Sequence, residues 1–363
     1  MTTRLHRRAV LALGLGAVAP LVVPRPGRAR SGPDSFAPLA RQVVPAVVNI
    51  AAVRDVPATA QRGDARGQLE EMARRFGQTR RPQAAQRATS LGSGFIIESS
   101  GITVTNNHVV EGAREISAIM NNGRTLPAQL LGRDDKTDIA VLKLKTEEKL
   151  PFVRWGDSDR IDVGDWVLAV GNPFGLGGTV TAGIVSARGR DLHAGPYDDF
   201  LQLDAPINQG NSGGPSFNMD GEVVGVNTAI YSPTGGSVGI GFAIPSNLAR
   251  QIVDELVRNG RIERGWIGVN IQDITPEIAN GLGLKGDVDG VIIAAVETSS
   301  PAARAGLRQG DIIVAVNGRR IDQVRDVPRT IAALRPGTDV MLTLLRRGQE
   351  VAVPVTTGRL PER

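Results

Sequence analysis

Short apolar segments separated by Gly, Asn and Pro dominate residues 90–244 of the chain. The clearest of them are residues 94–98, 103–105, 139–144, 166–170 and 223–230. Runs of about four to eight apolar and β-branched residues at such close spacing are typical of a β-sandwich or a β-barrel. The pattern therefore predicts a mainly β fold for this part of the chain.

The 363 residues are enough for two or three domains of about 100–200 residues each. The strand pattern stops at residues 247–259, where apolar residues recur at helical spacing, with Ser246 as a candidate N-cap and Gly260 as a stop signal. We therefore expect a large β domain, a helical linker and a second β-rich domain. Their ranges are 31–249, 250–264 and 265–357, and the last range contains helix-like segments at 275–279 and 326–334.

Residues 54–88 interrupt the first domain directly after the apolar stretch 43–53, which reads as a strand. They are rich in Arg and Gln and nearly free of β-branched residues. A segment this long without strand character is usually a functional or disordered loop. We expect a flexible exposed loop with a short helix at 69–76.

Residues 1–30 have the order of an export signal: Arg4, Arg7 and Arg8, then an apolar run at 9–23, then small residues at cleavage spacing. The adjacent arginines leave both a Sec and a twin-arginine signal open. The apolar run is short for a membrane-spanning helix, which needs about 20 residues. We expect an exported protein that meets the membrane only if the signal is not cleaved.

The export signal also explains the net charge of +5. Its six arginines account for +6, so the remaining chain has 36 basic and 37 acidic side chains, a balance of −1. Aromatic residues make up only 4% of the chain. A nearly neutral body with few aromatics argues against nucleic acid as a partner.

Several classes of chemistry are excluded by what the sequence lacks. Without cysteine there is no disulfide framework, zinc ribbon or thiolate catalysis. With only three histidines and no H-E-x-x-H motif, we expect neither a metal site nor a cofactor. No P-loop occurs, and the G-x-G-x-x-G match at 281–286 follows a helix-like segment and precedes a strand, the reverse of a dinucleotide-binding site.

A candidate nucleophile lies in Gly210-Asn211-Ser212-Gly213-Gly214-Pro215. Glycines let backbone N–H groups converge, so Gly210 and Ser212 are candidate donors of an oxyanion hole. The alternative is a solvated serine in a glycine-rich hairpin. The string also fits the nucleophile elbow G-x-S-x-G, but that arrangement needs a histidine after the serine, and none follows Ser212.

A base for Ser212 must therefore come from upstream, which leaves His108 and His193 because His6 lies in the export signal. His108 follows a β-branched strand, whereas His193 lies in a polar loop, and a base must be held rigidly. For the orienting acid we favour Asp138, which begins an apolar strand. The other candidates are Asp134 and Asp135 in a charged turn and Asp204 close to the nucleophile loop.

Together these strings resemble the HtrA/Deg family of serine proteases. The resemblance rests on Thr105-Asn-Asn-His-Val-Val110, Asp138-Ile-Ala-Val-Leu142, Gly171-Asn-Pro-Phe-Gly175, Gly210-Asn-Ser-Gly-Gly-Pro215 and Gly239-Ile-Gly-Phe-Ala-Ile-Pro245. It implies a chymotrypsin-like double six-stranded β-barrel followed by one PDZ domain. In that family's pattern His108 is the general base, Asp138 orients it, Ser212 is the nucleophile, and the backbones of Gly210 and Ser212 form the oxyanion hole.

The resemblance also implies roles outside the triad. The specificity pocket would be lined by Ile240, Gly241 and Phe242, and the PDZ domain would bind peptide C-termini at Trp266, Ile267, Gly268 and Val269. Arg190 matches a regulatory arginine that couples the PDZ domain to the active site, and Phe36 matches an aromatic residue through which family members form trimers.

The expected function is that of an ATP-independent, periplasmic serine endopeptidase of protein quality control and stress response. It would degrade unfolded or misfolded exported proteins, cutting after small aliphatic residues, without a cofactor and as a homotrimer. Two alternatives stay open: a non-proteolytic chaperone or peptide-sensing module on the same fold, and a protease dedicated to one regulatory substrate.

Overall fold

The computed structural model describes residues 32–55, 87–173, 177–192, 195, 197–208, 210–232, 236–281 and 289–361, with residues 55 and 87–90 described by their backbone alone. Residues 1–35 and 36–363 form two separate units, and the second unit contains every element described below. The expected export signal, the short helix at 69–76 and His193 lie outside the described residues.

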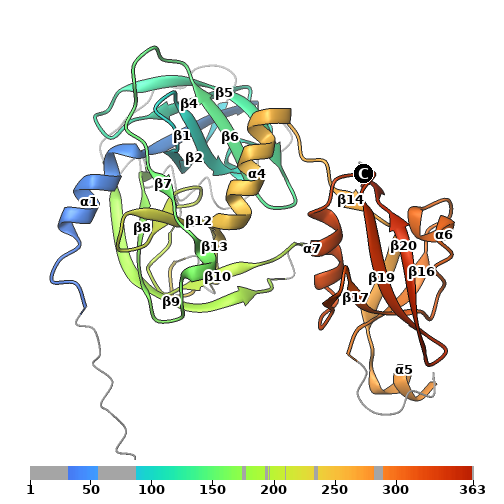
Figure 1. The fold of residues 1–363 in the computed structure, drawn as a ribbon. Helices are drawn as coiled ribbons and strands as arrows, with labels where there is room; N and C mark the ends of the chain where they lie inside the picture. The colour runs from blue at the N-terminus through green and yellow to red at the C-terminus, as the bar shows by residue number, and fades with distance from the viewer. Residues whose placement is uncertain are drawn as a thin grey trace, which may run out of the picture. The chain divides into compact units, whose positions relative to one another are not determined.

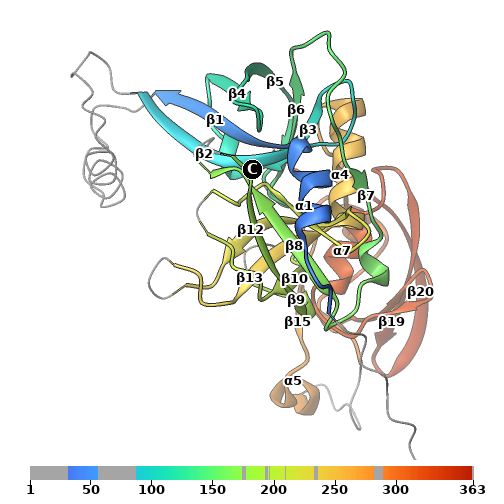
Figure 2. The ribbon, with the colours of Figure 1, turned by 90° about the vertical axis from the view of Figure 1, so that its left-hand side faces the viewer.

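The first sheet closes on itself as a six-stranded antiparallel barrel, in the order β1-β2-β3-β6-β5-β4. Its strands are β1 (Val47–Asp55), β2 (Arg87–Ile96), β3 (Ile102–Asn106), β4 (Glu115–Ile119), β5 (Thr125–Asp134) and β6 (Ile139–Leu144). β1 and β2 run side by side along their whole length (Figure 2), and β1 also pairs with β4. That second pairing closes the barrel.

The second sheet has the strand order β11-β8-β9-β10-β13-β12-β7, and an additional β11–β12 pairing closes six of its strands into a second barrel. Its strands are β7 (Arg154–Trp155), β8 (Trp166–Gly171), β9 (Thr179–Arg190), β10 (Phe200–Leu203), β11 (Pro215–Phe217), β12 (Glu222–Ile230) and β13 (Gly241–Pro245). β7 adds to β12 in parallel. The predicted chymotrypsin-like pair of six-stranded barrels is confirmed.

Strand β6 is apolar on both faces because each face meets a different core. Successive side chains of a strand point to opposite sides. Ala140 and Leu142 belong to the core of the first barrel, whereas Ile139 and Val141 belong to a core that also contains side chains of the second barrel. β8 alternates in the same way between the core of the second barrel and the shared core. This double burial explains the continuous apolar runs in the sequence.

The helices α1 (Ala37–Val43) and α4 (Ser246–Asn259) and the 3-10 turn η1 (Val44–Ala46) contribute side chains to the shared core. The one-turn helix α3 (Asn107–Val110) packs Val109 and Val110 into the core of the first barrel, and a second 3-10 turn, η2 (Ser158–Arg160), precedes β8. α4 lies against β5, β6 and β12 (Figure 1). Its buried apolar residues are Ala249, Ile252, Val253 and Leu256. Among the described residues, none of the helices has the length and apolar character needed to cross a membrane.

Several local expectations differ from the structure. The ends of the expected loop 54–88 belong to strands, because β1 runs to Asp55 and β2 begins at Arg87. The stretch 43–53 is helical as far as Ala46, and strand β1 begins only at Val47. Pro45 accounts for this, because proline lacks an N–H and suits the start of a helical turn. Ser246 is not the N-cap of α4. That position is Pro245, and the Ser246 hydroxyl donates instead to the Gly156 carbonyl at 2.9 Å. Gly260 does end the helix.

The C-terminal part folds around a core of its own (Figure 1). The main sheet has the order β15-β16-β17-β19-β20, β18 pairs with β17, and β14 pairs with β21. Its elements are β14 (Gly265–Trp266), β15 (Val269–Asp273), α5 (Pro276–Gly281), β16 (Val291–Val296), α6 (Pro301–Arg304), β17 (Ile312–Val316), β18 (Arg319–Arg320), α7 (Asp326–Ala332), β19 (Asp339–Arg346), β20 (Gln349–Thr356) and β21 (Gly358–Arg359). β15 is an edge strand of this sheet.

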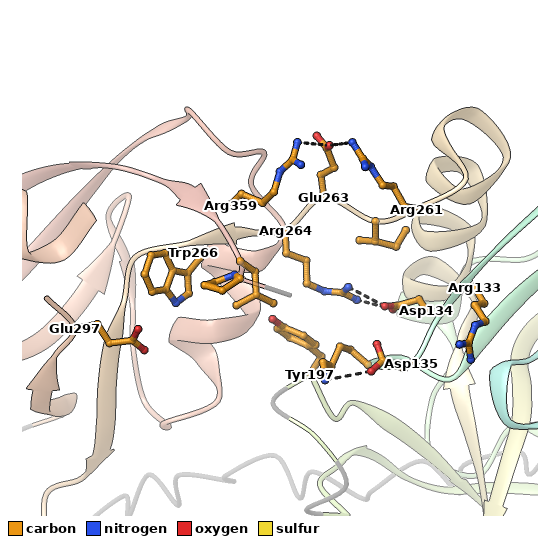
Figure 3. Close-up of a pocket in the computed structure, with 14 residues that line it drawn as sticks. Arg133, Asp134, Asp135, Tyr197, Arg261, Glu263, Arg264, Trp266, Glu297 and Arg359 are labelled. Carbon is orange, nitrogen blue, oxygen red and sulfur yellow. Dashed lines mark hydrogen bonds and ion pairs between the residues drawn. The ribbon is translucent and has the colours of Figure 1, made fainter. Parts of the chain in front are cut away.

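A buried ion pair ties the segment after α4 to strand β5. The guanidinium of Arg264 donates to both carboxylate oxygens of Asp134, at 2.8 and 2.5 Å (Figure 3). The two side chains are only 8% and 4% exposed. Arg264 also lies 4.8 Å from the ring centroid of Tyr197, a cation–π contact.

The attraction between Arg264 and Asp134 offsets the cost of removing the Arg264 charge from water. Burial disfavours the charged guanidinium, but the hydrogen bonds and charge of Asp134 outweigh it and raise the pKa of Arg264 above its usual value. Burial also raises the pKa of the Tyr197 phenol, although the neighbouring Arg264 opposes this shift. The end of β5 is therefore held by a buried, bidentate contact with Arg264.

We expect Asp134→Asn to destabilise the protein by about 3 kcal/mol, because it leaves a buried guanidinium without its counter-charge. Urea unfolding followed by circular dichroism measures the change. Glu148→Gln is the control, since Glu148 pairs with Arg124 in solvent and the side chains are 66% and 42% exposed. It should leave the unfolding midpoint unchanged. Equal midpoints for the two variants would contradict the assignment of a stabilising buried pair.

Candidate active site

His108 lies in α3, the single helical turn that follows β3. Its Nδ1 lies 2.8 Å from Asp138 Oδ2, and its backbone N–H donates to Asp138 Oδ1 at 3.0 Å. One carboxylate therefore fixes both the ring and the main chain of His108. The His108 side chain is 49% exposed, so the other edge of its ring is accessible.

Asp138 was expected to begin the strand, but it occupies the turn between β5 and β6, one residue before β6 starts at Ile139. Its backbone has φ 55°, a left-handed conformation that Asp tolerates better than most residues. The Asp138 carbonyl accepts hydrogen bonds from Asn107 N–H at 3.1 Å and Asn106 Nδ2 at 2.9 Å. The turn that carries the acid is thus bonded directly to the segment that carries the histidine.

Ser212 lies in the turn before β11. Its hydroxyl donates to the Thr228 carbonyl at 3.4 Å, and its own carbonyl accepts from Ser93 N–H at 2.8 Å. The next residue has to be glycine, because a Cβ on Gly213 would lie 2.3 Å from the Ser93 carbonyl oxygen. The glycines of this loop therefore permit a close approach to β2.

Thr228, in β12, was not found by the sequence reasoning. Its hydroxyl donates to Asp138 Oδ2 at 2.6 Å, and its carbonyl accepts the hydrogen bond from Ser212. This residue brings the candidate nucleophile and the candidate acid together. A threonine within a β-branched strand gives no sequence signal that separates it from an ordinary strand residue.

Arg54, at the end of β1, is a second residue that the sequence reasoning missed. Its guanidinium donates to the carbonyls of His108, at 2.7 Å, and Val109, at 3.2 Å. Carbonyls at the C-terminal end of a helix lack partners within the helix. Arg54 therefore satisfies the exposed end of α3 and fixes the turn that carries His108.

The rejected acids have other partners. Asp204 Oδ1 accepts the Ile184 N–H at 2.5 Å, Asp134 pairs with Arg264, and Asp135 lies 3.3 Å from Lys136 Nζ. His193 lies outside the described residues. In the described ranges, no group of three or more metal-binding side chains comes together.

Of the candidate specificity residues, Ile240 lies directly before β13, and Gly241 and Phe242 are its first two residues. Gly241 and Phe242 pair with Ile230 and Ala229 of β12, immediately after Thr228. Phe242 is 7% exposed and its ring packs edge-on against Phe200, 6.5 Å between centroids. A Cβ on Gly241 would lie 2.7 Å from Ile207, so the start of β13 is closely packed against apolar side chains.

The other candidate residues lie elsewhere. Arg190 ends β9, and its Nε donates to Gln202 Oε1 at 2.8 Å. Trp266 and Ile267 precede Gly268, and Val269 begins the edge strand β15. Phe36 packs on Trp166 with ring centroids 5.6 Å apart, and Trp166 is 40% exposed.

Two family descriptions match the sequence. "Trypsin-like peptidase domain" matches residues 92–226, and "PDZ domain" matches residues 265–357. The protein named "Probable periplasmic serine endoprotease DegP-like" from Brucella suis biovar 1 (strain 1330) is 46% identical over 355 residues, which are 90% of this chain and 69% of that protein. The protein of the same name from Rhizobium meliloti (strain 1021) is 51% identical over 281 residues, 77% of this chain and 56% of that protein.

Solved structures give the same result. "HtrA-type protease AlgW with decapeptide" is 41% identical, with a TM-score of 0.76 over 91% of this chain and 100% of that chain. "Crystal structure of the serine endoprotease from Yersinia pestis" is 37% identical, with a TM-score of 0.65 over the same shares of both chains. The chain therefore belongs to the HtrA/DegP-like family of periplasmic serine endoproteases, with a trypsin-like peptidase domain followed by one PDZ domain.

Proposed function

We propose that His108, Asp138 and Ser212 form the triad with which this endoprotease hydrolyses peptide bonds. The observation that carries the proposal is the set of donors around Asp138: the N–H and Nδ1 of His108 and the hydroxyl of Thr228. An ionised carboxylate only accepts hydrogen bonds, so His108 must carry its proton on Nδ1. In the neutral imidazole, a proton on Nδ1 leaves Nε2 with a free lone pair, so Nε2 can act as a base.

The reaction follows from this tautomer. Ser212 Oγ attacks the scissile carbonyl while His108 Nε2 takes its proton, and the imidazolium is stabilised by Asp138. The negative charge moves onto the former carbonyl oxygen, toward the backbone N–H groups of Gly210 and Ser212. His108 then protonates the leaving amine, and a water molecule repeats the sequence to release the acyl group and restore Ser212.

We propose further that the substrates are unfolded or misfolded exported proteins, cut after small aliphatic residues. Ile240, Gly241 and Phe242 would line the specificity pocket, and the packing of Gly241 on Ile207 and of Phe242 on Phe200 supports an apolar wall. Such a wall favours an aliphatic side chain over a charged one, because a charge would lose its hydration without gaining a partner. The same chemistry would serve a protease dedicated to one regulatory substrate.

The PDZ domain would bind peptide C-termini at Trp266, Ile267, Gly268 and Val269. β15 is an edge strand in the described sheet, and a peptide can extend such an edge by backbone hydrogen bonds. The AlgW structure described above carries a peptide. In this proposal Arg190 would transmit peptide binding to the active site.

We also propose a homotrimer formed through Phe36. The Phe36–Trp166 pair supports this assembly, because it leaves Trp166 partly exposed on the surface. Exposed aromatic side chains are enriched at protein–protein interfaces.

The first prediction from this proposal concerns the nucleophile. Ser212→Ala should lower cleavage of a reduced, unfolded model protein at least about 1,000-fold, because the covalent step is lost. Gel analysis measures the rate, and a fluorophosphonate probe should label the wild type but not the variant. Mass spectrometry of the products should place most cuts after Ala, Val or Ile. Wild-type protein that suppresses aggregation without cutting would support the chaperone alternative instead.

The second prediction concerns Thr228. Thr228→Val should lower kcat/KM about tenfold, because a hydrogen bond to a charged group contributes about 1.5 kcal/mol. Thr228→Ser keeps the hydroxyl and should retain most of the activity. Steady-state kinetics with a chromogenic peptide measure both variants. Equal activity of Thr228→Val and the wild type would contradict a role for this hydroxyl.

The third prediction concerns the peptide site. Gly268 has φ +79°, and a Cβ there would lie 2.3 Å from Ser300 Cβ, so Gly268→Ala should distort the peptide-binding loop. Gly318→Ala is the matched control: Gly318 has φ +78° and nothing within 4 Å of its added Cβ. Fluorescence anisotropy with a labelled hydrophobic C-terminal peptide should show a Kd at least about tenfold higher for Gly268→Ala. Equal affinity of both variants would place the peptide elsewhere.

A further inference from the structure

Ser93, in β2, is completely buried and all its polar groups have partners around the nucleophile loop. Its N–H donates to the Ser212 carbonyl at 2.8 Å, and its hydroxyl donates to the Gly210 carbonyl. The same hydroxyl accepts the Asn172 N–H at 2.8 Å, and the Ser93 carbonyl accepts from Thr105 Oγ1 at 2.7 Å. None of the mechanistic steps above uses this residue.

The two bonds to Gly210 and Ser212 fix the nucleophile loop at two points. Gly210 and Ser212 are also the residues whose N–H groups would form the oxyanion hole. Gly210 has φ +109°, and without a Cβ its backbone is unusually free to rotate. The hydrogen bond that its carbonyl accepts from the Ser93 hydroxyl restricts that rotation. The hydroxyl of Ser93 therefore supplies a restraint that the glycine itself lacks.

The hydroxyl also joins two loops of the second barrel. It has one proton, which it donates to Gly210, and a lone pair, which accepts the N–H of Asn172 after β8. The loops lie close together, because a Cβ on Gly210 would lie 2.6 Å from Pro173 Cβ. Asn172 is fully buried, so its N–H has no access to water if the hydroxyl is removed.

We propose that Ser93 is a positioning residue for the oxyanion hole, holding the Gly210–Ser212 backbone in the orientation in which its N–H groups face the developing negative charge. The inference rests on the proposed catalytic roles of Ser212 and Gly210. Donors of an oxyanion hole act on the transition state, where they must lie about 2.7–3.1 Å from the oxyanion. Loss of the Ser93 hydroxyl should therefore lower kcat and leave substrate binding nearly unchanged.

Ser93→Ala and Ser246→Ala make a matched pair. Both serines are fully buried, and both hydroxyls donate to a glycine carbonyl, Gly210 for Ser93 and Gly156 for Ser246. The Ser246 bond lies at the start of α4 and has no part in the proposed reaction. Loss of stability should be similar in the two variants, so a difference in catalysis reports on the oxyanion hole.

The experiment measures kcat and KM with a chromogenic peptide, and the Ki of a peptide boronate that forms a tetrahedral adduct with Ser212. For Ser93→Ala we expect kcat to fall about 10- to 100-fold, KM to stay within about twofold, and Ki to rise with the loss of kcat. Ser246→Ala should keep all three constants. Unchanged kcat in Ser93→Ala, or equal losses in both variants, would overturn the proposal.

Ser212→Ala separates this inference from the proposed function. If Ser212→Ala still cleaves peptides, the catalytic assignment fails and the inference fails with it. If Ser212→Ala is inactive but Ser93→Ala is fully active, only the inference fails. Should Ser93→Ala not fold, the test passes to Thr105→Val, which keeps the side-chain shape and frees the Ser93 carbonyl. That variant should lose at least about threefold in kcat at unchanged KM, and an unchanged kcat would overturn the inference.

Discussion

The active site depends on the apolar core that the two barrels share. Phe95 and Val141 from the first barrel pack there with Leu168, Val170 and Phe217 from the second. Burying one side chain of this size stabilises the folded state by about 1.5–3 kcal/mol. These contacts exclude water from the contact surface between the barrels, and the polar bonds between β2, β12 and the nucleophile loop are made beside them. Buried hydrogen bonds of this kind are stronger than those on the surface.

Hydrogen bonds across this contact surface connect the candidate catalytic residues of the two barrels. The first barrel carries His108 and Asp138, and the second carries Ser212. Thr228 joins the acid to the second barrel, whereas Ser93 joins the nucleophile loop to the first. In one bond a second-barrel residue contacts the acid of the first barrel, and in the other a first-barrel residue contacts the nucleophile loop of the second. Neither barrel can therefore shift without breaking bonds to the other. This arrangement favours rigidity at the point where a displacement of about 1 Å would be costly.

The sequence predicted the parts of this arrangement that depend on local pattern. Short strands, the glycines around Ser212 and the stop at Gly260 each have a local physical cause, and the comparison with known families confirmed the architecture. Thr228, Ser93 and Arg54 were missed because their importance comes from partners that lie 90, 117 and 54 residues away in the chain. A serine or threonine in an apolar strand has no distinguishing neighbour. The helical start of 43–53 was missed because the apolar residues obscured the effect of Pro45.

The chain order of the site follows from the order of the strands. His108 follows β3, Asp138 precedes β6, and Ser212 precedes β11, so the proposed base and acid both come before the second barrel in the chain. In the antiparallel pairing of β3 with β6, Asn106 lies opposite Ile139, which brings the neighbours His108 and Asp138 together within one barrel. The nucleophile joins them only when the second barrel packs against the first. The proposed triad therefore requires the packed pair of barrels, whereas the PDZ domain has a separate core. The peptide binding proposed for that domain would therefore not require repacking of the core on which the candidate site depends.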